Sequence, residues 1–129
     1  MKNKKVNPPI LKGAKVVVHD LPDATIYEVD EVDGFRVFLK YQRVDGRIVH
    51  IRGWTDISIL LYPTEEQLRN YQRMLIRVGS TVKNSAGKTC RVEGFYKGDV
   101  AILREIIPDE GGWVTTSPED IMNLELKRA

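Results

Sequence analysis

The side chains of this chain that could act as a nucleophile or a base are few and widely spaced. Cys90 is the single cysteine, and His19 and His50 are the two histidines. A nucleophilic cysteine needs a nearby base and an accessible, electropositive setting. Neither histidine lies in an element near Cys90, which alternates with Val92 in a run typical of a strand. We therefore predict that Cys90 is a small buried thiol.

The two histidines each allow an alternative interpretation. His19 stands next to Asp20 at the end of a predicted strand, an order that could supply a base and its orienting carboxylate. No serine or cysteine partner is evident, so we favour a polar strand terminus. His50 takes an outward position beside Arg52, which predicts a solvated residue or part of a binding surface.

The segment Ala86-Gly87-Lys88-Thr89 matches the end of a phosphate-binding loop. That motif needs a glycine five positions before the Gly-Lys pair, where this chain has Val82. It also needs a helix after the loop, whereas the residues from Cys90 onward favour a strand. We therefore predict a hairpin turn here rather than a nucleotide site.

Acidic side chains gather around the first predicted hairpin: Glu28, Asp30, Glu31 and Asp33. Paired acids can serve acid–base chemistry or bind a cation. Arg36 and Lys40 take outward positions on the next strand, so cross-strand ion pairs explain both sets of charges. With one cysteine and two histidines in the chain, we predict no metal, no cofactor and no catalytic residues, and hence no enzyme.

Composition and charge narrow the class of protein further. The 129 residues suffice for one ordinary domain or two very small ones, and 42% hydrophobic with 29% charged residues is a globular balance. A net charge of +2 is too near neutral to indicate nucleic-acid binding by field strength alone. The chain has no apolar run of membrane-spanning length, and its basic start leads into Asn-Pro-Pro, unlike a signal peptide. We therefore expect a soluble, cytoplasmic protein without membrane contact.

Turn residues divide the first half of the chain into short β-favouring runs that follow a lead-in of residues 1–12. The lead-in is basic and has two adjacent prolines, so we predict a flexible arm that buries nothing. Five predicted strands follow within residues 13–62, separated by turn signals such as Asp33-Gly34. These strands are Lys15–His19, Ile26–Val32, Phe35–Tyr41, Arg47–Trp54 and Ile59–Tyr62.

The period changes over residues 63–78, where we predict a linker helix. Thr64 with Gln67 three residues later makes a capping box. An apolar stripe of helical spacing follows, made of Leu68, Tyr71 and Leu75. This is the one helix that the sequence predicts.

The order of strands and turns then repeats in residues 79–129. Upstream, Gly13 and Val16 match Gly79 and Val82 at an offset of 66. At an offset of 64, six more positions are identical in the two halves, which indicates a duplicated β module. These pairs are Gly34 and Gly98, Leu39 and Leu103, Asp45 and Asp109, Asp56 and Asp120, Ile57 and Ile121, and Leu60 and Leu124.

The second half shows a resemblance to a known family of small domains. Its segments Val78–Val82, Cys90–Gly94, Gly98–Leu103 and Pro118–Ile121 are similar to those of SH3-like barrels of the bacterial KOW/Tudor-like kind. Small proteins that look like this are found in phages and mobile elements of Gram-positive bacteria. The resemblance implies binding rather than catalysis. It also implies a 3₁₀ turn at each Asp-Ile pair, which leads into the fifth strand.

We therefore expect a mainly β protein with two five-stranded SH3-like barrels, residues 13–62 and 79–129, joined by one short α-helix. A non-catalytic adapter or inhibitor that engages a macromolecular partner, above all another protein, through its barrel surfaces fits this architecture. The alternative is nucleic-acid binding by the basic face of the first barrel, where cations surround an outward aromatic residue. The candidate binding residues are Arg36, Phe38, Lys40, Arg43, Arg47, His50, Arg52 and Trp54.

Overall fold

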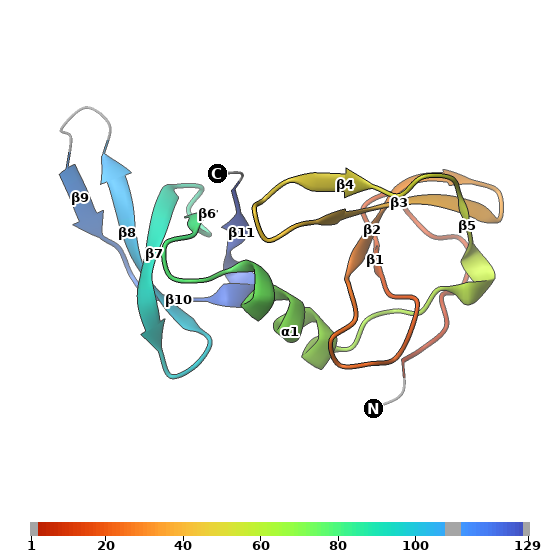
Figure 1. The fold of residues 1–129 in the computed structure, drawn as a ribbon, viewed down its shortest axis with the longest axis horizontal. Coiled ribbons are helices and arrows are strands. Elements are labelled where there is room, and N and C mark those ends of the chain that lie inside the picture. The colour runs from red at the N-terminus through yellow and green to blue at the C-terminus, as the bar shows by residue number, and fades with distance from the viewer. Residues whose placement is uncertain (1–2, 108–111, 128–129) are drawn as a thin grey trace. The chain divides into compact units, whose positions relative to one another are not determined.

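The computed structural model describes residues 3–107 and 112–127 and shows a mainly β chain, as the sequence predicts (Figure 1). The described strands form two antiparallel sheets, and the one α-helix of these residues lies between the sheets in chain order. The chain divides into two compact units. The first runs up to Tyr71 apart from residues 44–46, and the second consists of residues 44–46 and the chain from Gln72 onward.

The first unit contains a five-stranded sheet ordered β1-β2-β3-β4, in which β5 also pairs with β3. Its elements are β1 (Lys15–Val16), β2 (Tyr27–Asp33), β3 (Arg36–Gln42), β4 (Ile48–His50), β5 (Thr55–Asp56) and the 3₁₀ helix η1 (Ile57–Ile59). The sheet curves into a half-barrel. The predicted last strand, Ile59–Tyr62, is reduced to isolated bridges of Leu61 with Val17 and Lys5, because η1 takes up Ile59.

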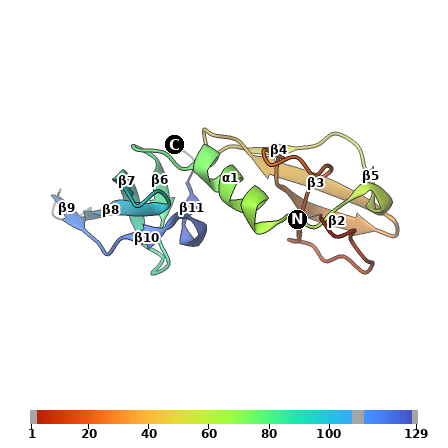
Figure 2. The same cartoon turned by 90° about the horizontal axis from the view of Figure 1, so that it is seen from below.

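The second unit contains a six-stranded sheet ordered β10-β8-β7-β6-β11, in which β9 also pairs with β8 (Figure 2). Its elements are β6 (Thr81–Lys83), β7 (Thr89–Tyr96), β8 (Val100–Ile107), β9 (Gly112–Thr115), β10 (Glu119–Asp120), η2 (Ile121–Asn123) and β11 (Glu125–Leu126). Strands β6 and β7 pair directly on either side of a turn that contains Gly87, whose φ of 79° suits a hairpin. The predicted hairpin at this segment is thus confirmed.

Both sheets follow the same pairing scheme, so the sequence repeat is also a repeat of hydrogen bonds. In each unit the first strand pairs with the second, and the long hairpin that follows has a β-bulge at the same point. The corresponding register pairs are Val16 with Tyr27 and Val82 with Cys90, and the bulges lie between Val29 and Glu31 and between Val92 and Gly94. Asp109, which matches Asp45 in the sequence repeat, lies outside the described residues.

An Asp-Ile pair begins a 3₁₀ helix near the end of each repeat, as the resemblance implies. Asp56 and Asp120 each accept a hydrogen bond at 2.9 Å from the backbone nitrogen two residues further on. Such a cap satisfies a backbone donor that the start of a helix leaves unpaired. The residues that follow the caps, Ile57 and Ile121, are both buried.

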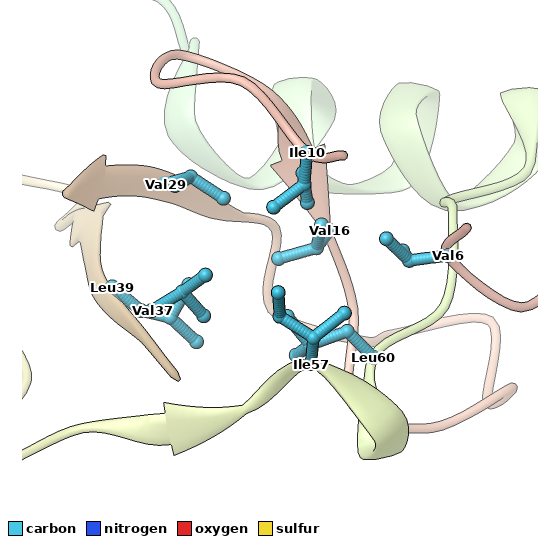
Figure 3. Close-up of a cluster of buried hydrophobic side chains, with 8 residues drawn as sticks. All are labelled: Val6, Ile10, Val16, Val29, Val37, Leu39, Ile57 and Leu60. Carbon is cyan, nitrogen blue, oxygen red and sulfur yellow. The ribbon is translucent and has the colours of Figure 1, made fainter. Parts of the chain in front are cut away.

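The core of the first unit is a cluster of buried aliphatic side chains that point toward one another (Figure 3). It consists of Val6, Ile10, Val16, Val29, Val37, Leu39, Ile57 and Leu60. Burial of such side chains is the main favourable term in folding. All but the first have buried apolar counterparts in the second unit, namely Ile76, Val82, Val92, Ala101, Leu103, Ile121 and Leu124.

The lead-in of the first unit is part of this core, which corrects the prediction that residues 1–12 bury nothing. Val6 and Ile10 are only 6% and 5% exposed. Backbone hydrogen bonds fix the segment, from Val6 N to Leu60 O at 3.2 Å and from Tyr62 N to Lys4 O at 2.8 Å. Composition was misleading because the few apolar residues of this segment are scattered among lysines, asparagines and prolines, whereas Val6 and Ile10 each add a full side chain to the cluster.

Helix α1 (Glu65–Leu75) begins with the predicted capping box. Thr64 N donates to Gln67 Oε1 at 3.0 Å, and Gln67 N donates to Thr64 Oγ1 at 3.2 Å. Gln67 is also buried, and its Nε2 donates to the carbonyl oxygens of His19 and Leu21. A buried amide is tolerated here because both its oxygen and its nitrogen have partners.

We predict that Ile10→Ala lowers the free energy of unfolding by about 2–4 kcal/mol, because it leaves a cavity in a packed core. Urea denaturation of the full chain, followed by circular dichroism, measures this change. Leu11→Ala is the matched control, since Leu11 is 75% exposed and its truncation should cost less than about 0.5 kcal/mol. Equal losses in the two variants would contradict a structural role for the lead-in.

Candidate binding surface of the first unit

The outward residues of β3 form the middle of the candidate surface. Arg36, Phe38 and Lys40 alternate with the buried Val37 and Leu39, as the sequence pattern predicts. Phe38 is only partly exposed, so it presents less ring area than a fully outward aromatic residue would. The alternation therefore explains which side chains of β3 reach solvent but not how strongly each is exposed.

Acidic residues of β2 lie opposite these positions. The register pairs Arg36 with Asp33, Phe38 with Glu31 and Lys40 with Glu28. Opposite charges on directly paired strand residues stabilise a sheet modestly without any further role. This face of the first unit is therefore mixed in charge rather than uniformly basic.

Asp30 joins two of the candidate residues into one cluster. It lies at the bulge of β2, with Oδ1 at 3.4 Å from Lys40 Nζ and Oδ2 at 3.2 Å from His50 Nδ1. Lys40 and His50 are themselves register partners on β3 and β4. Burial raises the pKa of Asp30, but the hydrogen bonds and charges of Lys40 and His50 outweigh it, and the net pKa is lowered. The predicted pairing of Asp30 with a cation of β3 is confirmed for Lys40.

Arg36 and Trp54 make up what we call the aromatic surface, and Phe35 is an exposed aromatic residue next to Arg36 in the sequence. The guanidinium carbon of Arg36 lies 4.3 Å from the centroid of the Trp54 ring, which is a cation–π contact. Trp54 is 50% exposed and Phe35 is 76% exposed. Pairing of β3 with β5 brings Arg36 and Trp54 together, because Arg36 is the register partner of Asp56 and Trp54 lies two residues before Asp56. Phe35 lies at the other end of this antiparallel pairing, where its carbonyl oxygen accepts a hydrogen bond from Ile57 N at 2.9 Å.

Asp56 borders the aromatic surface as the register partner of Arg36. Hydrogen bonds from Ser58 lower the pKa of Asp56, burial opposes them, and the charge of Arg36 lowers the pKa further. The carboxylate is therefore ionised at neutral pH. It gives Arg36 an anionic neighbour across the strand pair.

The remaining candidates, Arg43, Arg47 and Arg52, are exposed residues at the two ends of β4. Arg43 N donates to Arg47 O at 2.8 Å, which places these two residues across the β3–β4 hairpin from each other. We call the three residues the hairpin arginines. The candidate residues thus fall into three groups, which are the aromatic surface, the Asp30 cluster and the hairpin arginines, with Phe38 on β3.

Phe35 is the surface residue that the sequence analysis missed as a binding candidate. The pattern assigned it to the start of a strand, whereas the structure places it in the turn between β2 and β3. A large aromatic residue directly after an Asp-Gly turn signal is the feature that could have identified it. Turns run over the surface, so a side chain at this point has little to pack against.

The residues considered for catalysis do not assemble into a site in the part of the chain that the structure describes. Cys90 is fully buried, as predicted, and burial raises the pKa of its thiol, to which the charge of Glu105 adds. His19 Nδ1 accepts a hydrogen bond from Leu21 N at 3.2 Å, which is a local turn contact. Within the same residues, no three His, Cys, Asp or Glu side chains are grouped so that they could hold a metal ion.

Comparisons with known proteins assign no family to the chain. Neither a scan against models of protein families nor a search of curated proteins found a match. Among the described residues, no helix has both the length and the apolar character that a bilayer span requires. What the chain binds is therefore inferred from its own side chains.

We predict that Lys40→Gln raises the pKa of the Asp30 carboxyl group, because the variant removes a cation 3.4 Å away. A lowered carboxyl pKa stabilises the fold above the unfolded-state pKa, and this contribution is lost as the pH falls through the folded-state pKa. NMR titration of the Asp30 carboxyl carbon measures the shift. Lys97→Gln, in the second unit, is the control and should leave Asp30 unchanged. An identical Asp30 titration in Lys40→Gln would show that the ion pair does not form.

Proposed function

We propose that this chain is a non-catalytic binding protein, an adapter or an inhibitor, that engages a protein partner through the aromatic surface. In this proposal each unit is a small cytoplasmic SH3-like barrel of the KOW/Tudor-like kind, and α1 joins the two. Backbone pairing between the start and the end of each repeat supports it, as β6 pairs with β11 and Val17, directly after β1, bridges Leu61. The exposure of Trp54 beneath Arg36 is the observation that carries the proposal.

An exposed tryptophan in contact with an arginine has the composition that protein interfaces favour. Trp and Arg are enriched among the residues whose truncation costs most binding energy. The exposed ring of Trp54 offers apolar area that a partner can cover, and Phe35 offers a second exposed ring at the other end of the β3–β5 pairing. The cation–π contact restricts Arg36 and Trp54 before binding, so the complex loses less side-chain entropy.

The charges around the aromatic surface favour a protein over a nucleic acid. Arg36 has Asp33 and Asp56 as register partners, and Lys40 forms an ion pair with Asp30. These acids neutralise the cations that contacts with phosphate groups would require. A protein interface accommodates mixed charge, because complementary charges on the partner set orientation and specificity.

We predict that Trp54→Ala weakens partner binding about tenfold or more, which is the cost expected for truncation of an interface hot spot. The tagged chain captures the partner from a lysate of the native host, mass spectrometry identifies it, and calorimetry with the purified partner gives Kd. Ile48→Ala is the matched control, since Ile48 is an exposed aliphatic residue in β4 of the same sheet. That variant should change Kd less than about twofold. Full affinity of a folded Trp54→Ala variant would refute the role of this surface.

Nucleic-acid binding by the first unit is the second candidate, and the position of the hairpin arginines favours it. Arg43 and Arg47 face each other across the hairpin, and Arg52 follows β4 two residues later. Phe38 on the neighbouring strand offers part of a ring on which a base could stack. Cations beside an aromatic residue are the arrangement that single-stranded nucleic acids require.

If this second candidate is correct, labelled single-stranded or duplex oligonucleotides bind the chain at low salt and lose affinity steeply at moderate salt. Replacing all three hairpin arginines with alanine should weaken binding about tenfold or more, because three phosphate contacts are lost. The control is the pair Arg91→Ala and Arg104→Ala, which removes exposed arginines of the second unit. Fluorescence anisotropy measures each Kd, and no binding at low salt excludes this candidate.

A further inference from the structure

A groove in the second unit lies between the end of α1 and the β7–β8 hairpin. Its volume is about 490 Å³, which is within the range of protein pockets that hold small ligands. Three segments line the groove: residues 73–78, the β7–β8 hairpin and η2. All three belong to the second unit. The groove therefore belongs to a different unit from the aromatic surface, and the two share no residue.

The groove has an apolar floor and an open rim. Ile76 and Ile121 are buried and form the floor, whereas Val78 and Phe95 on the rim are exposed. Gly98 lines the hairpin side, and the position that its Cβ would occupy has open space around it, so a partner backbone can come close. Small-molecule sites enclose most of their ligand. An open groove of this kind is better suited to an extended chain that lies along it.

The charged residues of the groove leave a single cation for a partner. Arg73 Nε and Nη2 donate to Asp99 Oδ1 and Oδ2 at 2.7 and 2.8 Å, so these two charges cancel. Arg77 Nε donates to Met74 O at 3.2 Å, and we find no ion pair of Arg77 within residues 3–107 and 112–127. Its two terminal nitrogens are positioned as a pair of donors, which is the geometry that binds a carboxylate with both oxygens.

We propose that this groove binds an extended peptide segment of a partner, with an apolar side chain over Ile76 and Ile121 and a neighbouring carboxylate on Arg77. The inference rests on the proposed function, because it gives a protein-binding chain a second docking surface. Burial of the apolar side chain supplies affinity, and the Arg77–carboxylate pair sets the direction of the peptide. A nucleic acid fits less well, because a single arginine neutralises only one phosphate.

The repeat shows that the fold itself does not require these charges. Arg77 corresponds to Leu11 at the offset of 66, and Asp99 corresponds to Phe35 at the offset of 64. The first unit thus forms the same strand pairings with apolar residues at both positions. The arginine and the aspartate are therefore features of the groove rather than of the β module.

Selection of peptides on the full-length chain tests the proposal. The probe is a phage-displayed library of random dodecapeptides, from which we expect sequences with Asp or Glu next to an apolar residue. Fluorescence anisotropy with the best synthetic peptide should give a Kd that rises about tenfold or more in Arg77→Glu. Arg91→Glu is the matched control, since Arg91 is an exposed arginine of β7 outside the groove, and it should leave Kd unchanged.

Four results would overturn the proposal. They are a library that yields no peptide, selected peptides rich in Lys and Arg, an unchanged Kd in a folded Arg77→Glu variant, and self-association of the chain that Arg77→Glu abolishes. The last would assign the groove to a second copy of the chain. Trp54→Ala distinguishes this proposal from the proposed function. That variant should weaken binding of the partner captured from the lysate and leave the Kd of the selected peptide unchanged.

Discussion

In each unit the chain at the first strand, or directly after it, is hydrogen-bonded to the segment that ends the repeat, and the core depends on this contact. Val17 and Leu61 exchange two backbone hydrogen bonds of 2.9 Å in the first unit, and β6 pairs with β11 in the second. Closing so long a segment of chain costs conformational entropy, which the apolar side chains beneath the contact offset by their burial. The capped 3₁₀ helices lie directly before this contact in the chain. Leu60 and Leu124 follow them and are buried, so the helices fix where the chain enters the core. Strand pairing and core packing in each unit are therefore one cooperative event.

Local patterns predicted most of the elements, because those elements depend on residues close in sequence. Strand alternation placed Val37 and Leu39 in the core, and the Thr64–Gln67 capping box marked the start of α1. Non-local contacts account for the differences. The burial of Val6 depends on Leu60, which lies far along the chain, and the loop between β1 and β2 provides the carbonyl oxygens of His19 and Leu21 that make a buried Gln67 possible. A prediction from residues close in sequence to Val6 or Gln67 contains neither Leu60 nor the carbonyl groups of His19 and Leu21.

The candidate surface was predictable in its residue types but not in its grouping. Alternation identifies the outward side chains of β3, whereas a β-bulge shifts the register by one residue and cannot be seen in the pattern. That shift places Asp30 beside both Lys40 and His50, so two residues expected on a basic face belong to a charge-balanced cluster. The contact between Arg36 and Trp54 depends on the pairing of β3 with β5, and the sequence analysis predicted no strand at Thr55–Asp56. Long-range register therefore decides which cations remain for a partner.

The two repeats satisfy one backbone requirement in different ways, and this difference explains why their surfaces differ. Leu60 O accepts a hydrogen bond from Val6 N in the first unit, and its counterpart Leu124 O accepts one from Gln72 Nε2 in the second. An extended lead-in covers the core in the first case, and the end of a helix covers it in the second. Because buried carbonyl groups require partners, the inner side of each cover is constrained. The outer side is not constrained in this way: Arg77 at the end of the helical cover lines a groove in the second repeat, whereas its counterpart Leu11 at the end of the lead-in is an exposed aliphatic residue. Such divergence on an unchanged core favours two modules that recognise different features of their partners over a duplicated chemical site.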